Sequence, residues 1–190
     1  MAPRVGLLLF PTFSEFEVTV ALSLVPSAYE VVTLALDEST VRSEAGLLCQ
    51  PHKKLNDLEP ADLEVLIIPG GDIEHLLNAE PLFAFVGELH KQEKLLAAIC
   101  SGPFVLARAG VLAGFPYTVT FTREQRDFLG CFDEAGFRYE NVVTSGNVIT
   151  AQGHAFVPFG LAVGKHLDPE MSADVYTFYE GRGNPAMEAS

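Results

Sequence analysis

The stretch KLLAAICSGPFVLARAG, residues 94–110, gives the strongest indication of the fold. Its apolar first half is typical of a buried strand that ends near Ile99, and an amphipathic helix is predicted from about Gly102 to a terminating glycine, Gly110. So short a connection between strand and helix would lift Cys100 to the carboxyl edge of the sheet. Because ligands of open α/β sheets bind outside that edge, we expect chemistry at Cys100.

Strand-like and helix-like segments alternate along the rest of the chain. They predict an α/β three-layer sandwich of the flavodoxin-like class, with a mostly parallel open sheet and helices on both faces. Strands are expected at residues 5–10, 30–36, 65–71 (ending in a glycine turn) and 117–121, with a β pair that turns at 145–147. Helices are expected at 15–24, 73–77, 82–92, 123–129, 154–166 and 169–180. Residues 40–55 are expected to form a hairpin or an irregular excursion. We expect one domain over residues 1–190, with 181–190 as a loose tail.

The charge balance limits the choice of partners. The chain has 12 basic and 25 acidic residues and a formal net charge of -13, which would repel phosphate backbones and anionic membrane surfaces. Neither nucleic acid nor membrane is therefore an expected partner. The apolar run at 5–10 is too short for a signal peptide, and no segment has the roughly 18 uninterrupted apolar residues of a membrane helix, so a soluble protein is expected.

The cysteine pattern indicates the compartment. Cys49, Cys100 and Cys131 have no metal-ligand spacing, and any disulfide scheme leaves one of them unpaired. This usage is typical of reducing conditions and predicts a cytoplasmic protein without a structural metal or cofactor.

Two interpretations of Cys100 are open. The predicted helix directs its backbone N–H groups and positive dipole end toward the sulfur, which predicts a pKa below the ordinary value of about 8.5 and a reactive thiolate. Alternatively, Cys100 is only a small buried hydrophobic residue, as most free cysteines are.

Four segments together resemble the ThiJ/PfpI superfamily, within the class I glutamine amidotransferase-like fold. They are VGLLLFPTFSEFE (5–17), LIIPGG (66–71), AAICSGPFVLARAGVL (97–112) and VITAQGHAFVPFGLAV (148–163). The resemblance covers nearly the whole chain. It implies a homodimer with a two-fold contact near the active site.

The resemblance also implies roles for individual residues. Glu17 aligns with the family's acidic residue that reaches the cysteine sulfur, as a protonated carboxyl hydrogen-bonded to the thiolate; alternatively, it is a solvated carboxylate at a helix start. Gly70 and Gly71 match the family's PGG turn, whose N–H groups would form an oxyanion hole with that of Ser101. Glycine in that turn also satisfies simple turn geometry.

The chain departs from the family pattern at its histidines. Peptidase-like members carry a histidine directly after the cysteine, where this chain has Ser101, and other members place one in the region occupied here by residues 120–122. A cysteine hydrolase normally needs an adjacent general base. Peptidase and amidotransferase activity are therefore disfavoured. His154 is a candidate to line the pocket, with a capping or surface role as the alternative.

Three functions follow as hypotheses. In the first, the Cys100 thiolate attacks a small electrophile of the aldehyde, amide or isocyanide type, and Glu17 handles protons, as in a glyoxalase-like enzyme, a hydratase or a hydrolase. In the second, Cys100 oxidises to a sulfenic or sulfinic acid in a stress-response protein without rapid turnover. A binding or regulatory module is the third and is disfavoured, because we expect no helix-turn-helix extension and the net charge would repel DNA.

Overall fold

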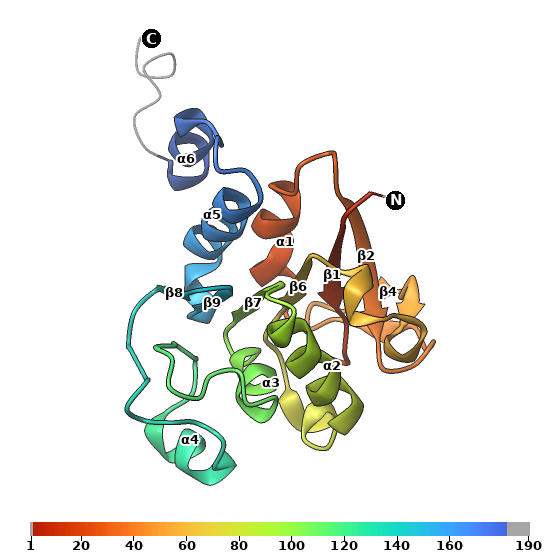
Figure 1. The fold of residues 1–190 in the computed structure, drawn as a ribbon, viewed down its shortest axis with the longest axis vertical. Coiled ribbons are helices and arrows are strands. Elements are labelled where there is room, and N and C mark those ends of the chain that lie inside the picture. The colour runs from red at the N-terminus through yellow and green to blue at the C-terminus, as the bar shows by residue number, and fades with distance from the viewer. Residues whose placement is uncertain (1, 182–190) are drawn as a thin grey trace.

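A computed structural model describes residues 2–181 of the chain (Figure 1). A seven-stranded sheet has the order β5-β2-β1-β6-β7-β9-β8, and only β8 runs antiparallel to its neighbour. Its strands are β1 (Arg4–Leu8), β2 (Glu30–Ala35), β5 (Lys53–Lys54), β6 (Val65–Ile68), β7 (Leu95–Ile99), β8 (Val142–Ser145) and β9 (Val148–Ala151). The segment predicted as a hairpin or excursion contains a separate antiparallel pair, β3 (Val41–Arg42) and β4 (Leu48–Cys49), and then the edge strand β5.

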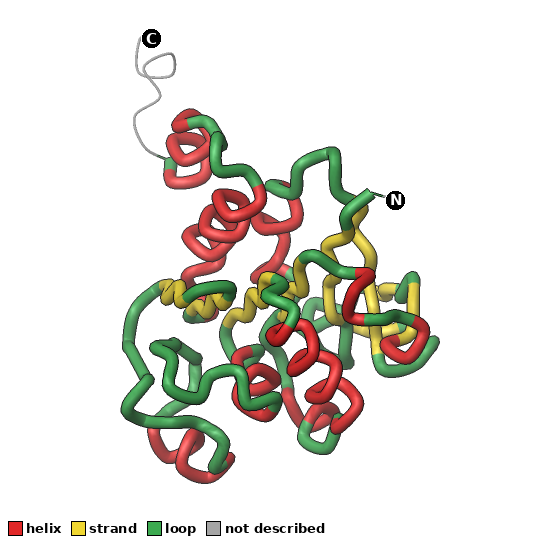
Figure 2. The backbone as a smooth tube through the Cα atoms, viewed as in Figure 1, coloured by secondary structure: helices red, strands yellow, loops and turns green. Residues whose placement is uncertain are grey.

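Helices cover both faces of the sheet. The α-helices are α1 (Phe16–Ser23), α2 (Glu80–Lys91), α3 (Pro103–Arg108), α4 (Arg123–Leu129), α5 (Phe156–Leu167) and α6 (Ala173–Glu180), and the 3₁₀ helices are η1 (Leu55–Asp57), η2 (Pro60–Asp62), η3 (Ile73–Leu76) and η4 (Gly153–Ala155). Helices α1 and α5 pack together on one face, and α2 and α3 pack on the other. Figure 2 shows the strands as a layer between these two groups. The structure confirms the predicted flavodoxin-like α/β class.

The core lies along the central strands. Every residue of β6 and β7 is buried, because helices cover both faces of these strands. This burial accounts for their continuous apolar sequences, which lack the alternation of a half-exposed strand. Each buried leucine or isoleucine contributes about 1.5–3 kcal/mol to stability. The central strands therefore hold a rigid edge at their carboxyl ends.

The strand predicted at residues 117–121 is absent. Tyr117 forms one isolated bridge with Phe137, whereas the Thr118 N–H donates to the Thr150 side chain at 2.9 Å and the Thr120 N–H donates to the Cys100 carbonyl at 2.8 Å. With those donors bonded to a side chain and to a turn, the segment cannot join a ladder. It forms a loop across the carboxyl edge of the sheet instead.

Two predicted helices are shorter in the structure. Helix α6 begins at Ala173 because the Ser172 hydroxyl accepts a hydrogen bond from the Asp174 N–H at 3.2 Å and caps the helix there. Helix α3 ends at Arg108, and the chain turns through Gly110 with φ +75°. None of the helices within residues 2–181 combines the length and apolar composition needed to cross a bilayer. Most of the predicted loose tail, residues 182–190, lies outside the described residues.

Candidate functional site

The site lies where β1, β6 and β7 end side by side. Glu17 is in the first turn of α1, Gly70 comes two residues after β6, and Cys100 follows β7 directly. Since the strands are parallel, their carboxyl ends share one edge of the sheet. The strand that follows β1 in the chain, β2, lies on one side of β1, and β6 lies on the other side. The carboxyl ends of β1 and β6 therefore form the topological switch point of the sheet.

Cys100 occupies a sharp left-handed turn. Its φ is +62°, a conformation that costs a residue with a side chain about 1–3 kcal/mol and clusters at functional sites. Two backbone hydrogen bonds hold the turn: the Cys100 N–H donates to the Ala151 carbonyl at 2.9 Å, and its carbonyl accepts from the Thr120 N–H at 2.8 Å. A Cβ on Gly102 would lie 2.6 Å from the Ile68 carbonyl oxygen, so only glycine fits there. The predicted strand–turn–helix geometry around Cys100 is confirmed.

Glu17 is a buried carboxyl group directed at the sulfur. Its side chain is hydrogen-bonded to Cys100, and its Oε2 accepts from the Gly70 N–H at 2.7 Å. The residue is 2% exposed, so the alternative of a solvated carboxylate is wrong. Burial raises the pKa of Glu17, and the negative charge of Glu44 adds to that effect, against the opposing hydrogen bonds from Cys100 and Gly70.

The environment of Cys100 opposes ionisation of the thiol. Burial, followed by the negative charge of Glu17 and its hydrogen bond, raises the pKa of Cys100 to about 12. The Ser101 N–H and the Thr120 side chain act in the opposite direction and are outweighed. The predicted lowering of the pKa is therefore wrong, because the half-buried sulfur lies against the Glu17 carboxylate. The Cys100–Glu17 pair carries one negative charge far more readily than two.

Two glycines enclose the pair. A Cβ on Gly70 would lie 2.5 Å from the Cys100 Cβ and 2.6 Å from Glu17 Oε2. A Cβ on Gly153 would lie 3.0 Å from both the Cys100 sulfur and Glu17 Oε1. A side chain at Gly70 would require the Cys100 or Glu17 side chain to move, and one at Gly153 would crowd both of them. Gly153 was not identified from the sequence as a site residue, although its segment was.

The predicted oxyanion-hole residues lie beside the pair, but the glycine N–H groups have other acceptors. The Gly70 N–H donates to Glu17, and the Gly71 N–H donates to the Ser101 hydroxyl at 3.0 Å. The same hydroxyl donates to the Gly71 carbonyl at 2.8 Å. The Ser101 N–H bonds to the Cys100 sulfur. An oxyanion would have to compete with these acceptors, so the oxyanion hole stays a prediction.

Thr120 belongs to the site and was not predicted as a functional residue. Its hydroxyl lies within hydrogen-bonding reach of the Cys100 sulfur, accepts from the Gly153 N–H at 2.9 Å and donates to Gln152 Oε1 at 3.0 Å. The Gln152 amide in turn donates to the Thr118 hydroxyl at 2.6 Å. A hydroxyl has one hydrogen, so Thr120 donates either to Gln152 or to the sulfur. The only sequence signal was its position in a region where relatives carry a histidine.

His154 takes the surface alternative. The residue is exposed, and its Nε2 lies 3.1 Å from Asn141 Oδ1. The neighbouring residue Gly153, and not His154, packs against the Cys100 and Glu17 side chains. Within residues 2–181, no three histidine, cysteine, aspartate or glutamate side chains gather in a way that could hold a metal ion.

Comparisons with known proteins show the family of the chain. The model of the DJ-1/PfpI family matches residues 3–165. The glutathione-independent glyoxalase DJR-1.2 of Caenorhabditis elegans is 30% identical over 161 residues, which are 80% of this chain and 82% of that protein. The isonitrile hydratase of Pseudomonas putida is 28% identical over 171 residues, which are 88% of this chain and 73% of that protein.

A solved structure extends the likeness to three dimensions. The DJ-1 superfamily protein Atu0886 of Agrobacterium tumefaciens superimposes with a TM-score of 0.83 at 26% identity, covering 99% of this chain and 100% of that one. Both the family model and the glyoxalase match span most of the chain, including the Cys100 turn. We conclude that the chain belongs to the DJ-1/PfpI family.

Proposed function

We propose that this protein is an enzyme in which Cys100 attacks the electrophilic carbon of a small aldehyde or isocyanide and Glu17 carries the proton. The observation that supports this most is the direct hydrogen bond between the buried Glu17 carboxyl and the Cys100 sulfur in a left-handed turn. A nucleophile beside a proton acceptor, held at a sheet edge, is the minimum arrangement for covalent catalysis.

For an aldehyde, the first step is balanced within the pair. The sulfur forms a bond to the carbonyl carbon, the C=O π electrons move to the oxygen, and the thiol proton passes to the Glu17 carboxylate. Glu17 then returns the proton to the oxygen and leaves a neutral hemithioacetal. Because burial raises the pKa of Glu17, its carboxylate is a better proton acceptor than an exposed one. Ser101 N–H and the Thr120 hydroxyl support negative charge on the sulfur before attack.

Two of the relatives support this substrate class. Those named above carry the names glyoxalase and isonitrile hydratase, which denote reactions of small electrophiles. At the pair, Ser101 stands where peptidase-like members carry a histidine, and Thr120 lies in the region, residues 120–122, where other members place one. Without an imidazole, peptide hydrolysis lacks the acid that normally protonates the leaving amine in cysteine hydrolases. We therefore propose aldehydes and isocyanides as substrates in preference to amides.

Oxidation of Cys100 is the second candidate function. The missing imidazole favours it, since oxidation needs no amine leaving group. A peroxide would give one oxygen to the sulfur as its O–O bond breaks, and the other oxygen would leave as water. The sulfenic or sulfinic acid formed would lie against Glu17 and the Ser101 N–H.

One experiment separates the two functions. The protein is incubated with methylglyoxal and with an alkyl isocyanide, and product is counted per Cys100, with Cys100→Ser and Glu17→Gln as test variants and Cys131→Ser as the matched control. Many product molecules per Cys100, lost in both test variants and retained in the control, would support the enzyme. At most one event per thiol would refute it, and selective gain of oxygen at Cys100 under peroxide would then favour the redox function.

We also infer that the protein is a cytoplasmic homodimer. The support is an exposed apolar patch formed by Phe16, Leu47 and Leu48, which are 49%, 56% and 65% exposed. The Glu44 N–H donates to the Phe13 carbonyl at 2.9 Å and joins the β3–β4 turn to the start of α1. The patch lies beside the element that carries Glu17, which is consistent with a two-fold contact near the site.

A further inference from the structure

We propose that the groove between η3 and α4 is the subsite that holds an aryl or branched alkyl substituent of the electrophile and selects uncharged over anionic substrates. The proposal rests on the proposed function and names the substrate class for the same site. The groove has a volume of about 490 Å³, within the range of small-molecule sites.

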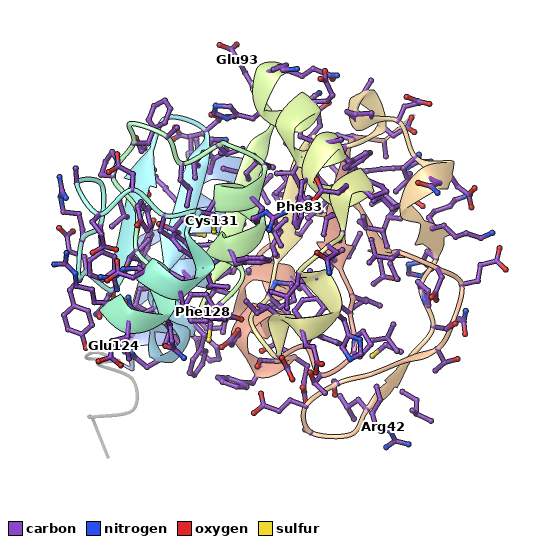
Figure 3. The ribbon with its side chains drawn as sticks, turned by 90° about the horizontal axis from the view of Figure 1, so that it is seen from below. Arg42, Phe83, Glu93, Glu124, Phe128 and Cys131 are labelled. Atoms are coloured by element: carbon purple, nitrogen blue, oxygen red, sulfur yellow. The ribbon has the colours of Figure 1, made fainter. Side chains whose placement is uncertain are left out.

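The groove is apolar at its walls. Ile73 and Leu77 form the η3 side, and Phe121, Phe128 and Leu129 form the α4 side. Phe128 is 89% exposed, although phenylalanine is among the residues most often buried. In Figure 3, which views the molecule from below, Phe128 lies on α4 at the surface. An aromatic ring left open beside an apolar groove offers a hydrophobic substituent a stacking surface.

The groove begins next to two residues that contact the catalytic pair. Gly71 lines the groove and follows Gly70, which packs against the Cys100 and Glu17 side chains. Phe121 lines the opposite wall and follows Thr120, whose hydroxyl contacts the sulfur. A substituent that extends from Cys100 past Gly70 or Thr120 would enter the groove.

Buried contacts hold the α4 wall in place before any ligand binds. Arg126 is 6% exposed, and its Nη2 donates to Glu134 Oε2 at 2.9 Å while its Nη1 donates to the Phe121 carbonyl at 2.7 Å. The guanidinium also lies 3.7 Å from the centre of the Phe137 ring. Arg126 thus connects α4, which carries Phe128 and Leu129, to the loop that carries Phe121. A preformed groove loses little conformational entropy on binding.

Charge decides which substituents fit. The lining includes Asp72, Glu74 and Glu124, and none of the lining residues is basic. Glu124 lies on α4 with Phe128 (Figure 3). The carboxylates would repel an anionic substituent, and the apolar walls would not compensate its lost hydration. The groove therefore suits an uncharged aromatic or branched alkyl group.

The first test does not depend on the reactivity of Cys100. Binding of the unreactive probe N-benzylacetamide is measured by saturation-transfer NMR with wild type, Phe128→Ala and the matched control Tyr139→Ala, whose ring is 81% exposed outside the groove. We expect binding to wild type and control, and at least threefold weaker binding to Phe128→Ala. Absence of binding to wild type, or equal binding to Phe128→Ala, overturns the proposal.

The second test links the groove to Cys100. Cys100 is alkylated with iodoacetamide, N-benzyl-iodoacetamide or iodoacetate, and each rate is divided by the rate of the same reagent with glutathione. In every case the sulfur displaces iodide and loses its proton. We expect the benzyl reagent to react about tenfold faster than iodoacetamide, iodoacetate to react slowest, and Phe128→Ala to lose most of the benzyl advantage.

The outcomes separate this proposal from the proposed function. A benzyl ratio near one in wild type, or unchanged in Phe128→Ala, means that the groove does not serve Cys100. If no reagent modifies Cys100, the proposed function fails, and the NMR measurement still decides whether the groove binds the probe. If Phe128→Ala changes the sedimentation of the protein, the groove is a subunit contact and the proposal is wrong.

Discussion

The buried Glu17 carboxyl and the half-buried Cys100 thiol are hydrogen-bonded to each other, so an ionised Glu17 makes ionisation of Cys100 harder. Glu17 arrives from the first turn of α1, and Cys100 arrives from the end of β7. Gly70 and Gly153 pack on the two side chains, and a Cβ at either glycine would crowd them. The proton affinities of these two groups are therefore properties of the pair.

We predict that Gly153→Ala disables the pair. The new methyl group would lie 3.0 Å from both the sulfur and Glu17 Oε1, so one of them must move. We expect Cys100-dependent turnover to fall at least about tenfold and the unfolding free energy to fall by about 1–3 kcal/mol. Gly87→Ala is the control, since its Cβ would meet nothing nearer than 3.6 Å. Equal turnover in the two variants would contradict the prediction.

We predict that Thr120→Val raises the pKa of Cys100 further. The substitution keeps the shape of the side chain but removes a hydroxyl that favours the thiolate. It also leaves the Gly153 N–H without its acceptor, so the free energy of unfolding should fall by about 1–3 kcal/mol. Alkylation rates against pH and chemical denaturation measure the two effects, with the exposed Thr144→Val as control. An unchanged alkylation profile would remove Thr120 from the site.

The pH dependence of stability should show the raised pKa of Glu17. Because the folded state binds this proton more tightly than the unfolded state, Glu17 favours folding while protonated, and this contribution is lost as the pH rises through its folded pKa. Glu17→Gln should therefore raise the melting temperature by about 2–4 °C near pH 8. The gain should shrink toward pH 4. If the gain in melting temperature instead grows as the pH falls, the pKa of Glu17 is lowered in the folded state rather than raised.

The exposed patch of Phe16, Leu47 and Leu48 predicts the subunit contact. Replacing Leu47 and Leu48 with serine should convert a dimer to a monomer in sedimentation velocity, because the contact loses its largest exposed aliphatic side chains. Phe178→Ser serves as the control, since its 76% exposed ring lies on α6. A wild-type protein that sediments as a monomer refutes the inferred dimer.

The fold was predictable because its signals are local. Residues 65–68 and 95–99 are unbroken apolar runs, as strands covered on both faces require. Gly102, two residues after Cys100, indicated the turn, and a Cβ at Gly102 would collide with the Ile68 carbonyl oxygen. By contrast, residues 117–121 have the composition of a strand but bond to Thr150 and to the Cys100 turn. Those partners are distant in sequence and left no local signal.

The chemistry of the site was only partly predictable. Cys100 and Glu17 were identified, the first from its turn and the second from the family resemblance. The direction of the pKa shift of Cys100 was not predicted correctly, because its burial and its contact with Glu17 depend on the tertiary structure. Gly153 and Thr120 were missed as site residues for the same reason. Their contacts with the pair arise only when β7, β9 and the loop at 117–121 meet.

The most direct test of the central claim is the rate of Cys100 alkylation by iodoacetamide as a function of pH, followed by mass spectrometry, in wild type and Glu17→Gln. We predict that the wild-type rate keeps rising beyond pH 9, because the pKa of Cys100 is raised to about 12. Glu17→Gln should lower that pKa while reducing turnover, since it removes both the negative charge and the proton acceptor. A wild-type rate that levels off below pH 8, with a higher pKa in Glu17→Gln, would contradict this and show that Glu17 acts as a protonated donor to a stable thiolate.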